Sequence, residues 1–482
     1  MKFLLLRTGN FESDKKTLMA DPSILPPLGL LYIGSILEQD GHDVEILDHY
    51  MEKLSKEKLK KALMSSDAIG MTVYSDSNLK PYLDISKMIK HMDSDIPQII
   101  GGPHCSFVQK QSLQDIPLAD ISVIGEGENV IIDLVRHFQG KKNLKDIPGI
   151  YYRNNGSIMS GKPLKIIEDL DSIPFPARHL VDKYDYGDVP FGYQLKKMVS
   201  SMVTSRGCPF HCRFCARYSN IIKRWRFRQR STENILQEFE EIDEKYRTIN
   251  IVDDSFLAVN KRAHRIFDGL INMGKDFDLV IQGTRVDFAD KILYKKMKKA
   301  GVKIIFLGIE SGNQDVLDFY NKEITLSQIR NAVKLSRKMN FITMGSFIIG
   351  APMETKKHIE NTIKFACSLP LDFASFGILK YIKGSQLYNE TIKNNKILNN
   401  TDKFFYFADS DLGLGSYPLN ELMDYILEAF RRFYFRPTYM ISQIYRNLLR
   451  NNFTLIQSGI NLLFSMKKEM WNYQKTNPNI KQ

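Results

Sequence analysis

The sequence has few cysteines, little glycine or proline and no long apolar run, and each of these absences excludes a class of protein. Its 482 residues include 29 Gly and 18 Pro, which excludes collagen-like and low-complexity chains. No apolar stretch approaches the roughly 18 residues that a membrane-spanning helix needs. The N-terminal run Phe3–Leu6 is too short for the core of a signal peptide and is typical of a strand. We therefore expect a cytoplasmic protein.

Only five cysteines are present, and three of them lie within eight residues. A secreted disulfide framework would usually show an even and dispersed set. Clustered thiols in a chain without a recognisable export signal favour a metal or cluster site. A structural zinc site usually has two separated ligand pairs, and His211 beside Cys212 is a poor fourth ligand.

The net charge of +12 is concentrated near the C-terminus, where nine Lys or Arg face only Glu469 from Arg431 onward. A general nucleic-acid binder more often spreads its charge along a face or groove, so we expect no nucleic-acid partner. The run Lys223–Arg230 interleaves basic and aromatic residues, a pattern also found in RNA-binding segments. Its place shortly after the three cysteines favours a role in lining a site there.

Apolar and basic residues alternate near the end of the chain in a helical pattern, comprising Leu455, Ile456, Ile460, Leu462, Leu463, Phe464 and Trp471 with Arg446, Arg450, Lys467 and Lys468. A basic amphipathic helix with a terminal Trp can lie on an anionic membrane surface, which would favour a lipid-like substrate. The alternative, which we favour, is a helix packed on the preceding domain with a solvated basic face.

Two regions of the chain alternate strands and helices. Residues 1–145 predict a doubly wound, Rossmann-like parallel sheet, and residues 198–390 predict six strands of a partial (β/α)6 barrel. Residues 146–197, with a hairpin at Asn155-Gly156, are expected to be a linker, and residues 391–482 a helical basic region. The expected fold class is therefore α/β, with functional loops at the carboxyl ends of the strands.

Two glycine-rich loops follow expected strands of the first region. They are Gly101-Gly102-Pro103-His104 and Gly125-Glu126-Gly127-Glu128. A single loop of this kind could simply form a tight turn. Two such loops on one sheet favour a ligand site.

The segment Ser205–Cys215 carries the most specific motif of the chain. Its thiols Cys208, Cys212 and Cys215 are separated by three and two residues, and no fourth cysteine is nearby. Three thiolates can hold three irons of a cubane cluster and leave one iron for a non-protein ligand, as expected of a catalytic cluster.

This motif resembles that of radical S-adenosylmethionine (SAM) enzymes, and further motifs follow in the same order. They are Arg228-Gln229-Arg230-Ser231, Asp253-Asp254, Gly283-Thr284-Arg285, Gly308-Ile309-Glu310-Ser311 and Gly350-Ala351-Pro352-Met353-Glu354. The N-terminal region resembles the cobalamin-binding domain of one large subgroup, through Pro26-Pro27-Leu28-Gly29-Leu30 and the two glycine loops. The resemblance covers roughly residues 1 to 390.

The resemblance implies three sets of site residues. Cys208, Cys212 and Cys215 would hold a 4Fe–4S cluster. SAM would be bound by Phe214, Asp253, Asp254, Arg285, Glu310, Gly350 and Glu354. Cobalamin would be bound by Thr72, Ser75, Gly101, Gly102, His104, Gly125, Glu126, Gly127 and Glu128.

One departure concerns the ligand on the lower face of cobalt. Domains that supply a histidine carry Asp-x-His-x-x-Gly after the first strand, whereas this chain has Asn10–Lys15 there, with no histidine. Either cobalamin is held without a protein imidazole, which we favour, or the domain has lost its corrinoid.

The resemblance implies reductive cleavage of SAM and attack of the resulting 5′-deoxyadenosyl radical on an unactivated C–H bond. With cobalamin, the expected reaction is methyl transfer to carbon of a small-molecule or lipid-like substrate. The alternatives are a radical cyclase or oxidative rearrangement enzyme, and a non-catalytic corrinoid or redox sensor. An external reductant such as flavodoxin or ferredoxin is expected as a partner.

Overall fold

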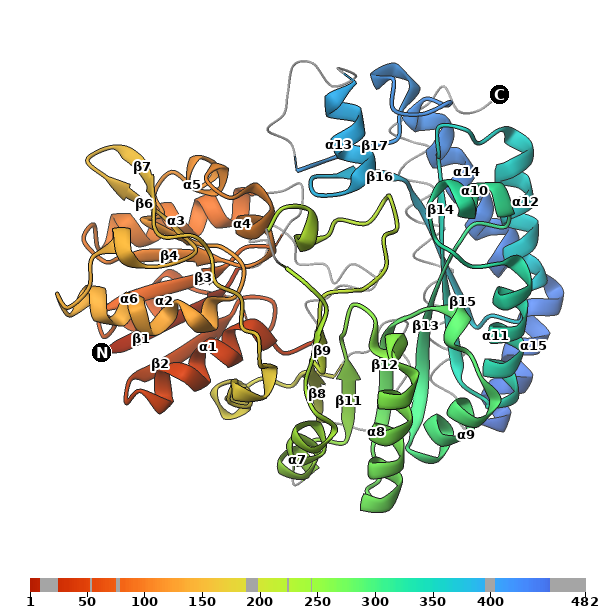
Figure 1. Cartoon of the computed structure of the whole chain (residues 1–482), viewed down its shortest axis with the longest axis horizontal. Helices are drawn as coiled ribbons and strands as arrows, with labels where there is room; N and C mark the ends of the chain where they lie inside the picture. Colours follow the sequence, from red (N-terminus) through yellow and green to blue (C-terminus); the bar gives the residue numbers. More distant parts are fainter. Residues whose placement is uncertain are drawn as a thin grey trace.

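The computed structural model describes residues 1–8, 25–52, 54–74, 79–187, 198–222, 225–243, 245–394 and 404–450. Two α/β units lie side by side, with the cysteine-containing segment between them (Figure 1). The expected Ser75, the loop Asn10–Lys15 and the C-terminal stretch 451–482 fall outside the described residues. Within the part of the chain that the structure describes, no helix has the length and apolar character to cross a membrane.

The N-terminal unit is a seven-stranded sheet of order β2-β1-β3-β4-β5-β6-β7. Five strands run parallel, namely β1 (Lys2–Arg7), β2 (Asp43–Asp48), β3 (Ala68–Thr72), β4 (Gln98–Gly101) and β5 (Ile121–Val123). The hairpin of β6 (Ile150–Asn154) and β7 (Ser157–Ser160), from the stretch expected as a linker, extends this sheet with antiparallel strands. Its turn uses Asn155 and Gly156, both with positive φ.

Side chains of β1 alternate between the two faces of this sheet, and a layer of helices packs on each face. Phe3 packs in the cluster of α1 and α6, whereas Leu4 packs in that of α2 and α3, because successive strand residues face opposite sides. The helices are α1 (Leu28–Gln39), α2 (Lys56–Leu63), α3 (Lys80–Met92), α4 (Pro103–Val108), α5 (Gln111–Asp115) and α6 (Ile131–Phe138). The doubly wound arrangement expected from the sequence is confirmed.

The second unit is a six-stranded parallel sheet of order β15-β14-β13-β12-β11-β8. Its strands are β8 (Val199–Met202), β11 (Thr248–Ile251), β12 (Asp278–Thr284), β13 (Val302–Glu310), β14 (Ile342–Ile349) and β15 (Phe373–Ile378). The helices that follow them are α7 (Thr232–Asp243), α8 (Asn260–Met273), α9 (Lys291–Lys299), α10 (Gln314–Phe319), α11 (Leu326–Lys338) and α12 (Lys356–Ser368). This arrangement confirms the partial barrel.

Short strands frame the cysteine loop on both sides. β9 (Ser205–Arg206) pairs with β10 (Arg228–Gln229) at one end, and β16 (Lys380–Ile382) pairs with β17 (Phe405–Phe407) near the helix α13 (Gln386–Lys393). The loop thus lies between the two α/β units.

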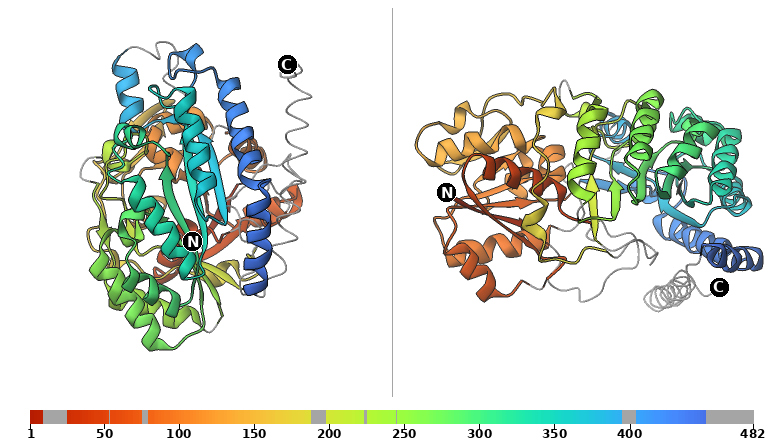
Figure 2. Two further views of the ribbon diagram at one scale, coloured as in Figure 1. Left: turned by 90° about the vertical axis from the view of Figure 1, so that its right-hand side faces the viewer. Right: turned by 90° about the horizontal axis from the view of Figure 1, so that it is seen from below.

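Two C-terminal helices, α14 (Leu419–Tyr434) and α15 (Pro437–Leu449), lie at the end of the molecule away from the N-terminal sheet (Figure 2). Arg446 and Arg450 do not form the solvated basic face that the sequence favours. Both guanidinium groups reach Asp372, at 3.1 and 3.2 Å, and donate to the carbonyl of Phe341. Helical periodicity could not predict the buried carboxylate of Asp372, with which both arginines form ion pairs.

Candidate functional site

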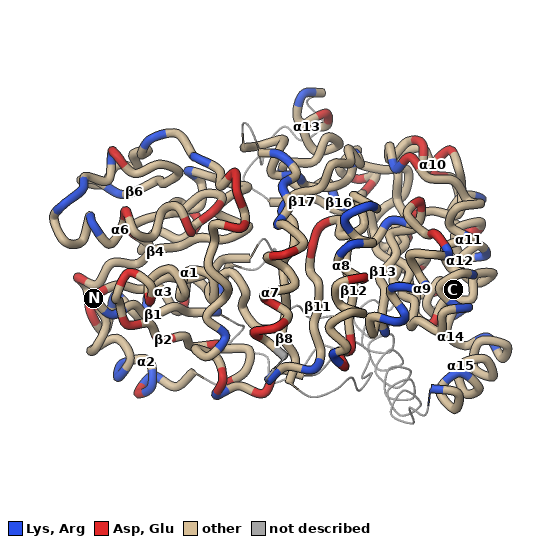
Figure 3. Tube along the Cα trace, turned by 60° about the horizontal axis from the view of Figure 1, so that its bottom comes forward, with Lys and Arg blue, Asp and Glu red and all other residues tan. Residues whose placement is uncertain are grey.

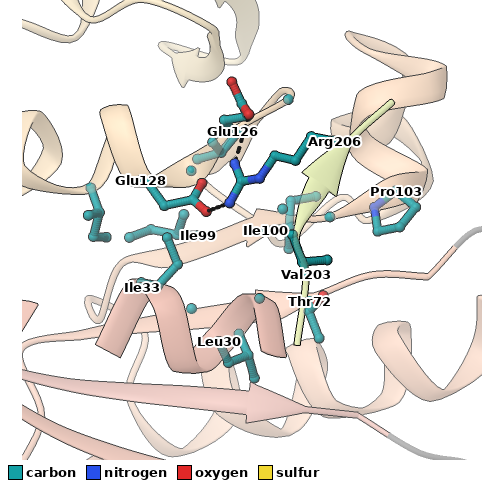
Figure 4. A pocket seen from close by; sticks show the side chains of 18 of the residues that line it. Leu30, Ile33, Thr72, Ile99, Ile100, Pro103, Glu126, Glu128, Val203 and Arg206 are labelled. Carbon is teal, nitrogen blue, oxygen red and sulfur yellow. Dashed lines mark hydrogen bonds and ion pairs between the residues drawn. The ribbon is translucent and has the colours of Figure 1, made fainter. Parts of the chain in front are cut away.

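A cavity of about 350 Å³ opens between the two sheets, where the carboxyl ends of their strands face each other. The N-terminal sheet lines it with Thr72 and both glycine loops, and the second unit contributes Arg206 (Figure 4). Gly207 and Asp254 of the second unit also line it. Most of the other lining side chains are aliphatic. Because parallel strands end at one edge of a sheet, residues distant in sequence meet here.

Glycines allow the backbone to close around this cavity. Gly102 has a φ of +98°, and a Cβ there would lie 2.9 Å from Oγ1 of Thr72. Gly125 has a φ of +76° and packs against Leu164. L-residues rarely adopt either conformation, so these positions require glycine. The glycine loops and Thr72 are therefore brought together as expected.

Arg206 joins the two units at the wall of the cavity (Figure 4). Its Nη1 donates to Glu126 at 2.7 Å, and its Nη2 donates to Glu128. Glu126 also accepts from Nη1 of Arg228, at 2.9 Å, and from the backbone N–H of Ile167. Burial alone would raise the pKa of Glu126, but Arg228, Arg206 and the Ile167 N–H outweigh burial and lower it. Glu126 is thus held ionised by two arginines of the unit that carries the cysteines.

An aromatic stack continues this wall. Tyr218 stacks on Phe107 with 4.6 Å between ring centroids and contacts Trp225 at 4.9 Å. The guanidinium of Arg228 lies 4.7 Å from the centre of the Trp225 ring, and Trp225 itself packs on Gly207. Trp225 therefore lines the cavity, as the sequence favours for the basic run 223–230.

The cysteine loop is fastened to the turn after α10. Arg213 donates its backbone N–H to the carbonyl of Tyr320 at 2.9 Å, and Nδ2 of Asn321 donates to the carbonyl of His211 at 3.1 Å. Burial raises the pKa of all three loop thiols, that of Cys215 to about 12, and the neighbouring thiols raise the pKa values of Cys208 and Cys215 further. The three thiols thus lie on one short loop of eight residues.

Lys322 contacts several of the residues that are expected to bind SAM. Its Nζ pairs with Oε1 of Glu310 at 2.7 Å and lies 5.9 Å from the ring centre of Phe214, and its carbonyl accepts from Nη2 of Arg285 at 2.8 Å. Glu310 has a φ of +66°, a strained conformation at the end of β13 that turns its carboxylate toward Lys322. Nη1 of Arg285 is buried without a hydrogen-bond partner. This nitrogen can therefore donate to the carboxylate of a ligand.

The adjacent carboxylates Asp253 and Asp254 point in different directions. Asp253 is buried and accepts hydrogen bonds from the backbone and hydroxyl of Thr204, each at 2.6 Å, and from the hydroxyl of Ser205. Asp254 lines the cavity instead. Burial raises its pKa, and the charge of Asp253 adds to this effect. Asp253 therefore fixes the strand that leads into the cysteine loop, and Asp254 is the carboxylate available to a ligand.

Glu354 organises the loop that begins at Gly350. Its Oε2 accepts from the backbone N–H groups of Gly350, at 2.6 Å, and Ala351, at 2.8 Å. Burial raises its pKa to about 7, although these two hydrogen bonds oppose the shift. Gly350 has a φ of +99°, so glycine is required where the chain leaves β14. Glu354 shapes this loop from within.

The structure does not bring His104 to the cavity. Its Nε2 lies 2.8 Å from Oδ2 of Asp115, and its ring is buried beside Phe404. No histidine occurs among the described residues that line the cavity. His104 is the second residue of α4 and pairs with Asp115 at the end of α5, a long-range contact that the sequence could not reveal.

Sequence reasoning gave no role to Arg206, Tyr218, Tyr320 or Lys322. Arg206 stands within the segment quoted for its cysteines, and its contact with Glu126 joins residues eighty positions apart. Lys322 lies in a turn between two helices, where no strand-end pattern marks it. Only the fold brings it under the cysteine loop.

These residues fit the three expected groups. The glycine-rich, largely apolar wall suits a corrin ring. The neighbouring thiols suit an iron–sulfur cluster. The unsatisfied Nη1 of Arg285 and the exposed side of Asp254 suit the carboxylate and ammonium of an amino acid moiety.

Comparison with known proteins supports the same assignment. Residues 202–366 match the model of the radical SAM superfamily, and residues 18–135 match that of the B12 binding domain. An uncharacterized methyltransferase of Pyrococcus horikoshii is 32% identical over 428 residues, which cover 88% of this chain and 90% of that protein. An anaerobic magnesium-protoporphyrin IX monomethyl ester cyclase of Cereibacter sphaeroides is 27% identical over 85% of this chain and 67% of its own length.

The fold also matches a solved structure. The cobalamin-dependent SAM radical enzyme OxsB, with aqua-cobalamin and SAM bound, superposes with a TM-score of 0.69 at 16% identity, covering 99% of this chain and 75% of that one. The matched domains imply a 4Fe–4S cluster, SAM and cobalamin as cofactors. The chain therefore belongs to the cobalamin-dependent radical SAM enzymes, in which a B12-binding domain precedes the radical SAM domain.

Proposed function

We propose that this enzyme transfers a methyl group to an unactivated carbon of a small molecule. The observation that carries the proposal is the cavity between the two sheets, which residues of both units line. Its N-terminal wall, within residues 1–145, is the proposed cobalamin site, and residues 198–390 hold the proposed cluster and SAM sites. A methyl donor and a radical generator that share one cavity can act on the same substrate carbon.

The residues of the chain divide this work between them. Cys208, Cys212 and Cys215 hold the cluster in the proposal. Arg285 offers its unpartnered Nη1 to the SAM carboxylate, and Asp254 accepts from the ammonium. When bound, the cluster and SAM supply radical hydrogen abstraction, and cobalamin supplies the methyl group.

Lys322 and Glu310 act together in the SAM site. Lys322 pairs with one carboxylate oxygen of Glu310. The other oxygen accepts a long hydrogen bond from the hydroxyl of Ser346, at 3.5 Å, and can also accept from a ribose hydroxyl. Glu354 orients the Gly350 loop, whose backbone would approach the adenine. Thr72 and the glycine loops would leave room for the corrin.

Radical cyclisation is the second candidate, because a 27% identical relative is a cyclase of magnesium-protoporphyrin IX monomethyl ester. It needs the same cofactors and the same cavity. The two reactions differ in the fate of the SAM methyl group. Methylation consumes that group, whereas cyclisation leaves it on methionine.

The test uses the full chain, reconstituted anaerobically with iron, sulfide and cobalamin. It is incubated with extract metabolites, a reductant and SAM carrying a deuterated methyl group, and a Cys212→Ala variant is the control. Methylation predicts S-adenosylhomocysteine together with 5′-deoxyadenosine, and a metabolite that gains the labelled methyl in wild type only. 5′-Deoxyadenosine without label transfer would favour cyclisation, and neither product would favour a sensor.

A further inference from the structure

A second hollow, of about 420 Å³, lies on the side of the cysteine loop that faces α13. We call it the α13 groove, and its lining residues are His211, Cys212, Arg217, Asn220, Gln386, Asn389, Glu390 and Lys393. It shares no residue with the cavity between the two sheets. Apart from Cys212, none of these residues has a part in the proposed methyl transfer.

The cysteine loop forms one wall of this groove and is held firmly to the other. Arg213 accepts at its carbonyl from the N–H of Leu387 at 3.1 Å, and its Nη2 pairs with Glu390 at 2.6 Å. Nδ2 of Asn220 donates to the carbonyl of Gly384 at 2.8 Å. The groove is therefore a fixed feature of the surface beside the cluster loop.

Cys212 connects the groove with the interior of the barrel. Of the three loop cysteines it is the one that lines the groove. Two residues further along the loop, the ring of Phe214 lies 5.9 Å from Nζ of Lys322, which pairs with Glu310 on the barrel side. A cluster bound to Cys212 would thus have solvent on one side and the SAM residues on the other.

The charge of the groove is positive. Arg217 and Lys393 line it, and the carboxylate of Glu390 is neutralised by Arg213. Nη1 of Arg217 donates a hydrogen bond to Nδ1 of His211, which holds the Arg217 side chain in place. Basic and acidic residues both occur along the chain trace of the two units (Figure 3).

We infer that the α13 groove is the docking surface for a small acidic electron-carrier protein of the flavodoxin or ferredoxin type. The carrier gives one electron to the cluster and is oxidised by one electron, and the net positive charge of the cluster falls by one. No bond is made or broken and no proton moves. Opposite charges steer such short-lived encounters, whose interfaces are commonly small.

The other side of the cysteine loop cannot serve this purpose. There, Gly207 and Arg206 border the cavity assigned to the cofactors, and the N-terminal sheet covers it. A carrier on that side would displace the B12-binding domain. The α13 groove gives access without moving either unit. The inference requires the cluster but not the identity of the methyl acceptor.

The experiment follows reduction of the cluster-loaded full chain by reduced flavodoxin, in anaerobic stopped flow. The variants are Lys393→Glu alone and Lys393→Glu with Arg217→Glu. We expect the bimolecular rate constant of the double variant to fall at least about tenfold at low ionic strength. The single variant should fall by about threefold, and both differences should shrink as salt screens the charges.

Two controls separate docking from damage to the cluster. The pair Lys60→Glu and Lys61→Glu, on exposed positions of α2, makes the same change of charge away from the groove and should stay within about twofold of wild type. Dithionite, a small reductant that needs no docking surface, should reduce all variants alike. Lys393 lies outside the cysteine loop, so if the double variant loads its cluster poorly, the result of the single variant Lys393→Glu decides the test. Flavodoxin rates unchanged in Lys393→Glu, or an equal loss with dithionite, would overturn the inference.

Discussion

Replacing Arg206 with methionine tests how the two units are held together. The change removes both ion pairs of Arg206 and keeps a side chain of similar length. Glu126 retains Arg228, at 2.9 Å, and the N–H of Ile167. Glu128, whose side chain is 10% exposed, loses its ion-pair partner. The main cost is therefore one buried carboxylate without compensation.

Removing one partner of a buried pair typically costs 3–5 kcal/mol. Because Glu128 keeps some access to water and Glu126 keeps two partners, we expect the lower end of this range, about 3 kcal/mol. This corresponds to about a hundredfold change in the equilibrium between the joined and separated units. Glu128→Gln, which spares the Arg206–Glu126 pair, should cost about 1–2 kcal/mol.

Trp225 provides the assay, because it lies in the wall between the units and only one other tryptophan, Trp471, is present. In a Trp471→Phe background its fluorescence reports separation of the units in urea. Arg226→Met is the matched control, because its pair with Glu168 is 65% and 57% exposed and should contribute less than about 1 kcal/mol. A loss below about 1 kcal/mol for Arg206→Met, equal to that of Arg226→Met, would refute the reasoning.

Three further predictions concern the SAM side. Asp254→Asn should weaken SAM binding about tenfold in equilibrium dialysis and leave the iron content unchanged. Asp253→Asn should instead lower the iron content, because it removes the hydrogen bonds that hold the strand leading into the cysteine loop. Lys322→Met leaves Glu310 buried and unpaired, so unfolding in urea should require about 3 kcal/mol less, and Lys322→Arg should recover part of this loss. Burial raises the pKa of Glu354 from 4.5 to about 7, so between these two pH values the folded chain binds more protons than the unfolded chain. The free energy of unfolding should therefore fall by up to about 3 kcal/mol as the pH rises from 4.5 to 7. Glu354→Gln should flatten this dependence in urea midpoints measured from pH 5 to 8; an unchanged slope would contradict the assignment.

Local pattern was sufficient for the framework of this protein. Both sheets follow from strand and helix periodicity, and residues after successive parallel strands meet at one edge whatever the details of packing. The glycine loops, Arg285, Glu310 and the cysteine loop could be placed for this reason. The spacing of the three thiols was specific enough to indicate the cluster.

Side-chain direction and long-range pairing could not be predicted. Asp253 and Asp254 are neighbours in sequence, yet one holds a turn and the other faces the cavity. Lys322 reaches Glu310 from a turn between helices, a position that no strand pattern marks. Arg446 has a helical spacing that suits a surface, but a buried Asp372 draws it inward. Each outcome depends on tertiary contacts that act across many residues.

The most direct test of the account is the cofactor content of the full chain, purified without oxygen, reconstituted, and analysed for iron and extracted corrinoid together. A shared cavity for both cofactors predicts about four iron atoms and about one corrinoid per chain. Iron without corrinoid, even after growth with cobalamin, would contradict the account and leave the N-terminal sheet without the role proposed for it.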